Sequence, residues 1–134
     1  MLAFSAAQIA QAEHDRFFGK ADRALAARVP EWAQSGLAER REFVERCLAR
    51  AAGYGMASEQ SVMAYALAAL WMGLGFEDES PLLKQLLRAP APELRKAHGL
   101  SEWVADQLGP VATPASGDAA IRRSFALTEP WGRT

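Results

Sequence analysis

The chain has 134 residues, half of them hydrophobic, with 15 basic and 16 acidic side chains and a formal net charge of −1. This length and composition are typical of one globular domain rather than of a disordered chain. No stretch carries the surplus of basic residues that binding to a phosphate backbone requires, so nucleic acid is not an expected partner. The single cysteine, Cys47, excludes an intramolecular disulfide and suits a reducing compartment.

Targeting and membrane signals are weak in this sequence. Residues 1–4 lack both the basic and the apolar region of a signal peptide. The most apolar stretch, residues 62–76, is too short to span a bilayer and includes two glycines. We therefore expect a cytoplasmic protein that does not contact a membrane.

The N-terminal half of the chain predicts two long helices. The first, over residues 5–28, opens on a capping box of serine and glutamine and ends just before a proline. The second, over residues 37–52, has an apolar stripe at helical spacing, and glycines end it. Cys47 lies on that stripe and is expected as a small core residue. Between the helices, residues 30–36, which include Trp32, predict a connector or a short helical turn.

The following segments predict three more helices. Residues 58–74 are apolar on nearly every side, so this helix should be central and buried, with Trp71 in the core. A fourth helix opens at residues 80–81, where serine and then proline stand in the favoured order. A fifth is predicted over residues 92–108, with Gly99 as a candidate break.

The arrangement of these segments predicts an all-α fold. No internal repeat and no strand-like alternation is present in the sequence. We expect a compact bundle of four to five helices around a buried central helix (58–74), in one domain over residues 1–110. Residues 111–134 are expected as a linker and a C-terminal tail.

Motifs for catalysis or for binding a cofactor are not found. The glycines near residues 53–55 and 73–75 follow helices, whereas a phosphate-binding loop precedes one. Adjacent helical side chains diverge by about 100°, so the run at residues 13–15 cannot converge on a metal ion. His14 is expected to pack against Phe17 or Phe18. His98 can pair with Glu102, four positions later, if its helix is continuous. We expect no enzyme activity, no cofactor and no metal.

Candidate partner-binding residues come from an acidic run and from the aromatic surplus. Residues 77–79 precede a helix, where their negative charge suits the positive end of the helix dipole as a solvated run; the alternative is a docking patch. Two of the four tryptophans stand in a connector and near the C-terminus, where they either anchor a partner or fold back onto their own domain. The candidate contact residues are Trp32, Glu77, Asp78, Glu79, Phe125 and Trp131.

Two segments carry a family resemblance. Residues 50–62 (RAAGYGMASEQSV), followed by residues 74–81 (LGFEDESP), resemble small helical bacterial proteins that are often encoded beside type VI secretion effectors and spike components. The resemblance extends over residues 5–90, and its motifs mark helix ends and packing rather than chemistry. It implies that the partner is a secreted effector or a spike component. The implied role is that of an adaptor or chaperone, or of an immunity protein.

Two other functions remain open from the residues. One is a small-molecule-binding or enzymatic helical domain, with a pocket lined by aromatic residues and methionine and a histidine at its polar edge. The other is a structural helper that acts as a homo-oligomer. The pocket would be formed by Tyr54, Tyr65, Trp71 and Met72, with His14 or His98.

Overall fold

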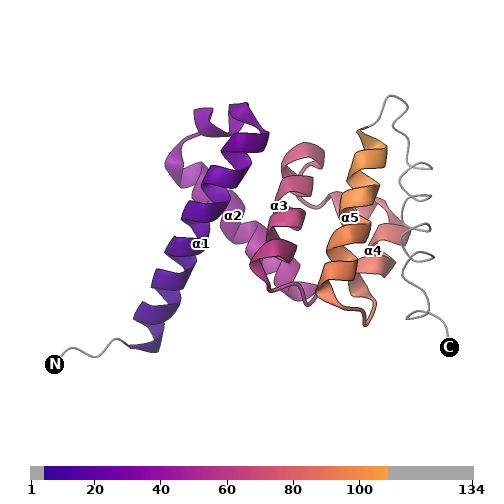
Figure 1. Ribbon diagram of the computed structural model, residues 1–134, viewed down its shortest axis with the longest axis horizontal. Helices are drawn as coiled ribbons and strands as arrows, with labels where there is room; N and C mark the ends of the chain where they lie inside the picture. Colours follow the sequence, from indigo (N-terminus) through magenta and orange to yellow (C-terminus); the bar gives the residue numbers. More distant parts are fainter. Residues whose placement is uncertain (1–4, 109–134) are drawn as a thin grey trace. The chain divides into compact units, whose positions relative to one another are not determined.

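The computed structural model describes residues 5–108, which form five α-helices, two 3₁₀ helices and no strand (Figure 1). The prediction of an all-α fold with four to five helices is therefore confirmed. The predicted linker and tail, with Phe125 and Trp131, lie outside the described residues, as do residues 1–4. In chain order the elements are α1 (Ala6–Arg28), η1 (Pro30–Gln34), α2 (Leu37–Gly53), α3 (Glu59–Met72), η2 (Phe76–Glu79), α4 (Pro81–Arg88) and α5 (Glu93–Gln107).

The helix starts follow the local chemistry that the sequence predicts. In α1 the Ser5 side chain accepts a hydrogen bond from the Gln8 amide at 3.1 Å, and the Gln8 side chain accepts one from the Ser5 amide at 2.8 Å. Ser58 caps α3 and Ser80 caps α4 in the same manner, each accepting from the amide three residues on. Of the helices within residues 5–108, none is both long enough and apolar enough to cross a bilayer.

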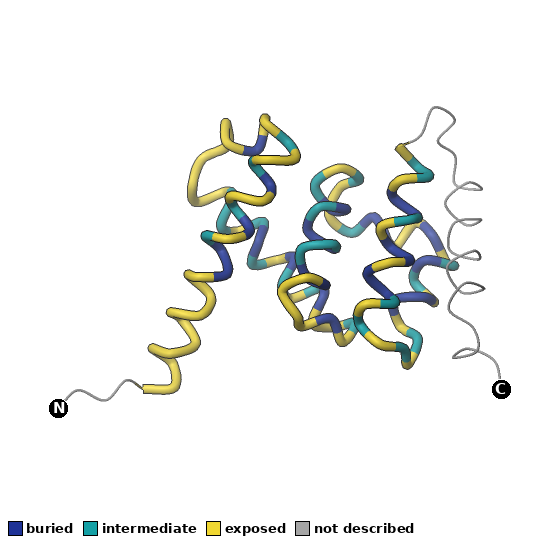
Figure 2. Tube along the Cα trace, in the orientation of Figure 1, coloured by how far each residue is buried: buried dark blue, intermediate teal, exposed yellow. Residues whose placement is uncertain are grey.

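The described residues form two compact units that divide between Arg46 and Cys47, and this boundary falls within α2. In the first unit η1 lies against α1, and the Trp32 ring packs edge-on against Phe43 with ring centroids 5.5 Å apart. Residues 5–16 of this unit are all exposed (Figure 2). This half of α1 is rich in alanine, the best helix former, and its capping box supports the first turn.

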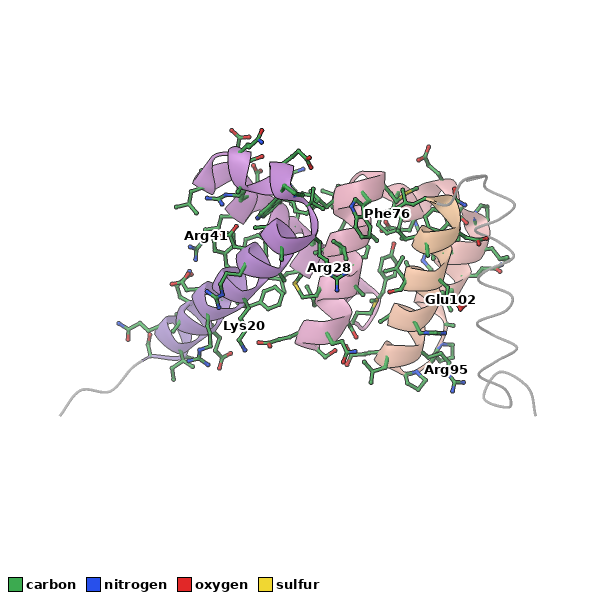
Figure 3. The ribbon with its side chains drawn as sticks, turned by 45° about the horizontal axis from the view of Figure 1, so that its top comes forward. Lys20, Arg28, Arg41, Phe76, Arg95 and Glu102 are labelled. Atoms are coloured by element: carbon green, nitrogen blue, oxygen red, sulfur yellow. The ribbon has the colours of Figure 1, made fainter. Side chains whose placement is uncertain are left out.

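In the second unit α3 packs against α5, and α4 packs against both α5 and η2 (Figure 1). Side chains fill the space between α3 and α5, with Phe76 labelled among them (Figure 3). The Phe76 ring lies 5.4 Å from the Tyr65 ring and 5.9 Å from the Trp103 ring, measured between centroids. These three aromatic residues, one from each of α3, η2 and α5, form the centre of the unit.

The break predicted at Gly99 is wrong. Helix α5 runs without interruption from Glu93 to Gln107, and Gly99 is buried within it. Tertiary packing offsets the roughly 1 kcal/mol that a glycine costs inside a helix. Because the helix is continuous, the conditional pair forms: His98 Nε2 lies 3.8 Å from Glu102 Oε1.

Candidate functional site

The centre of the second unit contains a fully buried carboxylate. The Glu77 side chain is 0% exposed. Tyr54 Oη donates to Glu77 Oε2 at 2.7 Å, and Tyr65 Oη donates to Oε1 at 2.9 Å. Arg50 donates to Oε2 from both Nη2, at 2.9 Å, and Nε, at 3.1 Å. We call the four residues Arg50, Tyr54, Tyr65 and Glu77 the Glu77 latch, because they join α2, the turn that follows it, α3 and η2.

Local structure brings the members of the Glu77 latch together. Arg50 and Tyr54 are four residues apart at the C-terminal end of α2, so they point in similar directions. Tyr65 is on the buried side of α3. Gly75 has φ +88°, a left-handed conformation that glycine adopts readily, and it turns the chain from α3 into η2.

The electrostatics of the latch favour the charged pair. Burial raises the pKa of Glu77, but the donors Tyr54, its own backbone, Arg50 and Tyr65 outweigh burial and lower its pKa below the ordinary value of 4.5. The hydrogen bond to Glu77 raises the pKa of Arg50 above its ordinary range. Burial, followed by the bond to Glu77, raises the pKa of Tyr54 to about 12. At neutral pH the carboxylate is therefore ionised, and both tyrosines remain protonated as donors.

A second group of charged side chains, more exposed than Glu77, lies next to the latch. Asp78 accepts from Arg50 Nη2 at 3.2 Å and pairs with Lys84 of α4. The hydrogen bond from Lys84 lowers the pKa of Asp78. Glu79 is exposed. The interpretation of residues 77–79 as a solvated acidic run is wrong for Glu77, because its carboxylate is enclosed by three side chains of its own unit.

Two further polar groups in this unit were not identified from the sequence. Glu93 Oε1 accepts from the amides of Ala57 and Ser58 at 2.5 and 2.8 Å, so its carboxylate caps the N-terminal end of α3. Lys96, which is buried, donates from Nζ to the Tyr54 carbonyl at 2.8 Å, beyond the C-terminal end of α2. The negative carboxylate of Glu93 suits the positive N-terminal end of α3, and the positive charge of Lys96 suits the negative C-terminal end of α2. Burial lowers the pKa of Lys96.

Cys47 lies in the core as predicted, with an exposed fraction of 0%. Burial, and then the nearby Glu77 carboxylate, raise the pKa of the Cys47 thiol to about 12. A thiol in this state is not a nucleophile at neutral pH.

Trp32 of η1 is buried, whereas Trp71 of α3 is exposed. Trp32 is only 5% exposed, and its Nε1 donates to Asp22 Oδ1 at 2.7 Å. Arg40 donates to the same oxygen at 3.2 Å. Of the two alternatives for Trp32, the structure shows packing on its own unit, so this side chain is not a surface contact for a partner. Trp71, expected in the core, is 42% exposed on α3.

Trp71 belongs to an apolar surface, which we call the α3 face. The side of α3 opposite its buried residues carries half-buried Met63, Leu67 and Leu70 and exposed Trp71, and Leu74 in the following turn is exposed as well. Within α3 the positions 63, 67 and 70 repeat at intervals of four and three residues, which is the spacing of a coiled-coil seam. No charged residue occurs between Glu59 and Glu77. The segment therefore contributes only uncharged side chains to this face, and the face is partly open to solvent.

Other candidate sites are not assembled in the described part of the chain. No three His, Cys, Asp or Glu side chains of residues 5–108 are placed so as to hold a metal ion. His14 Nδ1 lies 3.2 Å from Glu45 Oε1, so this imidazole faces a carboxylate. A surface hollow of about 460 Å³ lies on α4 and another of about 360 Å³ on α1, and the residues proposed for a small-molecule pocket line neither. Tyr65, one of those residues, is fully buried in the latch.

Comparison of the chain with models of protein families, with curated proteins and with solved structures finds no match. The function is therefore argued from the residues of the α3 face and of the Glu77 latch.

Proposed function

We propose that this protein is an accessory protein that binds another protein through the α3 face. The observation that carries the proposal is Trp71, which is 42% exposed on a face that also presents Leu74, 36% exposed. Tryptophan is enriched among the residues that dominate binding energy at protein interfaces. Hydrophobic residues scattered singly over a surface need no explanation, but several on one side of a helix indicate an interaction site.

The spacing of the α3 face favours a helix as the binding element of the partner. Apolar residues at intervals of three and four fit a groove or seam of the same spacing on a second helix. Covering the exposed parts of Trp71 and Leu74 stabilises a complex by about 1 kcal/mol for each side chain. A charged residue at the centre of such a contact would lose its water without gaining a partner, so the matching surface is apolar.

The resemblance of residues 50–62 and 74–81 supplies the context of the proposal. We assign the protein a role as an adaptor or chaperone, or as an immunity protein, for a type VI secretion effector or spike component. The proposed location is the cytoplasm, and the proposed role needs no catalytic residue. Three of the four members of the Glu77 latch lie in the resembling segments, Arg50 and Tyr54 in the first and Glu77 in the second, which supports a shared structural core rather than a shared chemistry.

Co-expression with the effector and spike proteins encoded beside its gene tests this function. The tagged chain is expected to retain one of these proteins on an affinity column, and Trp71→Ala is expected to lose it. Leu94→Ala is the matched control, because Leu94 is an equally apolar side chain, 57% exposed on α5. Retention of no neighbouring gene product, or equal retention by the wild type and Trp71→Ala, would contradict the proposal.

A further inference from the structure

One member of the α3 face does not belong to helix α3. Leu74 lies in the turn between Gly73, with φ +98°, and Gly75, with φ +88°. A Cβ added at Gly73 would meet nothing within 4 Å, so the backbone conformation rather than a lack of space favours glycine there. Trp71 is in helix α3 and Leu74 is not, so the position of Leu74 relative to Trp71 depends on what holds the chain after the turn.

The chain after the turn is held mainly by side chains. Backbone hydrogen bonds in this segment are local: Phe76 donates to Gly73 at 3.1 Å, and Asp78 donates to Gly75 at 3.0 Å. The long-range contacts come from the ring of Phe76, which lies against two aromatic rings, and from the carboxylate of Glu77, held by the other members of the latch. Asp78 adds an exposed pair with Arg50 and another with Lys84 of α4. We call residues 73–79 the strap. The hydrogen bonds of the Glu77 latch hold this short segment against α2 and α3.

The rest of the unit does not depend on the latch in the same way. Helix α3 packs against α5 through apolar residues that make no hydrogen bond with Glu77, among them Val62, Ala66 and Leu100. Segments with few long-range contacts open locally while the packed core stays closed. A buried ion pair also contributes less to net stability than apolar side chains of similar volume do, so a role in holding one geometry accounts better for its presence.

We propose that Glu77 is a positioning residue for the α3 face: its carboxylate holds residues 73–79 in place and so fixes the position of Leu74 relative to Trp71. This inference rests on the proposed function of the face. Loss of a latch hydrogen bond opens the strap, displaces Leu74 and weakens partner binding, whereas α3 remains on α5.

Amide hydrogen exchange on the full chain tests the inference without a partner. Tyr54→Phe removes one donor to Glu77, and Glu77→Gln removes the charge while keeping the shape. Each is expected to speed exchange of the amides of residues 74–79 by roughly tenfold, with α3 and α5 unchanged. Glu79→Gln, an exposed change two residues away, is the control and is expected to exchange like the wild type. Should Glu77→Gln fail to fold, Tyr54→Phe still decides the result.

Exchange that rises equally throughout the second unit, or that stays unchanged in residues 74–79, would overturn the inference. Partner affinity separates it from the proposed function. If the wild type binds the neighbouring effector and Tyr54→Phe binds it equally well despite an open strap, the positioning role is wrong and the proposed function stands. If no partner binds, the proposed function fails together with the positioning role, and the exchange result still reports whether the strap is fastened by Glu77.

Discussion

Arg50 and Glu77, 27 residues apart in the chain, are joined by two hydrogen bonds of 2.9 and 3.1 Å to one carboxylate oxygen. The guanidinium is partly exposed and the carboxylate is fully buried, so the pair connects the surface of the second unit to its interior. Charge-assisted bonds of this kind are roughly twice as strong as neutral ones. The pair is therefore the first place to test how this unit is held together.

Acid is expected to destabilise the protein through Glu77. Its pKa is lower in the folded state than the ordinary value of 4.5, so the carboxylate stabilises the fold above that value, and the contribution is lost as the pH falls through the folded pKa. Urea unfolding at a series of pH values measures this. Glu77→Gln is expected to lower stability at pH 7 by about 3 kcal/mol and to flatten the dependence below pH 5. A variant with the same acid slope as the wild type would assign that slope to other carboxylates.

Removing Arg50 alone is expected to cost more than removing both partners. Arg50→Met leaves a buried, ionised Glu77 without its cation, held only by the two tyrosines and its own backbone, at a cost of about 3 kcal/mol. The double variant Arg50→Met, Glu77→Leu is expected to recover at least half of that loss, because no charge remains buried. Chemical unfolding of the wild type, both single variants and the double variant gives the coupling energy. Additive effects would show that the two side chains act independently.

The two buried tryptophans are expected to respond differently to replacement by phenylalanine. Trp32 Nε1 bonds Asp22, so Trp32→Phe is expected to destabilise the protein by about 1–2 kcal/mol. Trp103 Nε1 is buried without a hydrogen-bond partner among the described residues, while the ring stacks on Phe76. Trp103→Phe loses buried ring volume but leaves no polar group unpaired, so it is expected to cost less than Trp32→Phe. Thermal unfolding distinguishes the two, and an equal loss would contradict the assignment.

Cys47 is expected to be inert in the folded protein. Its side chain is 0% exposed, and burial raises its pKa to about 12, so neither access nor thiolate is available at pH 8. A thiol reagent that gives a coloured product is expected to label it only after denaturant is added. Rapid labelling of the native protein would show that the α2 end of the second unit opens readily.

The helix ends could be predicted from the sequence because capping is local chemistry. The side chains of Ser5 and Ser58 each accept a hydrogen bond from the amide three residues further along, so the sequence pattern and the structure agree. The buried side of α3 could not be predicted from the sequence. The helix is apolar on nearly all sides, so the spacing of its apolar residues does not single out one face. Packing against α5 decides it, and Trp71 is left on the open side.

The contacts of the Glu77 latch could not be predicted from the sequence for a different reason. Arg50 and Tyr54 stand four residues apart, but their acceptor is more than twenty residues further along the chain. Three consecutive acids occur there, and nothing local distinguishes Glu77 from its neighbours. Only the turn at Gly75 determines which of the three carboxylates points inward.

The central claim is that the α3 face binds a partner, and calorimetric titration with the effector or spike protein encoded beside the gene tests it most directly. Trp71→Ala is expected to weaken the affinity by at least about tenfold, the loss of a single anchoring side chain, and to leave thermal stability nearly unchanged because this side chain is 42% exposed. Leu94→Ala is expected to bind within about twofold of the wild type. Equal affinity of the wild type and Trp71→Ala would contradict the account.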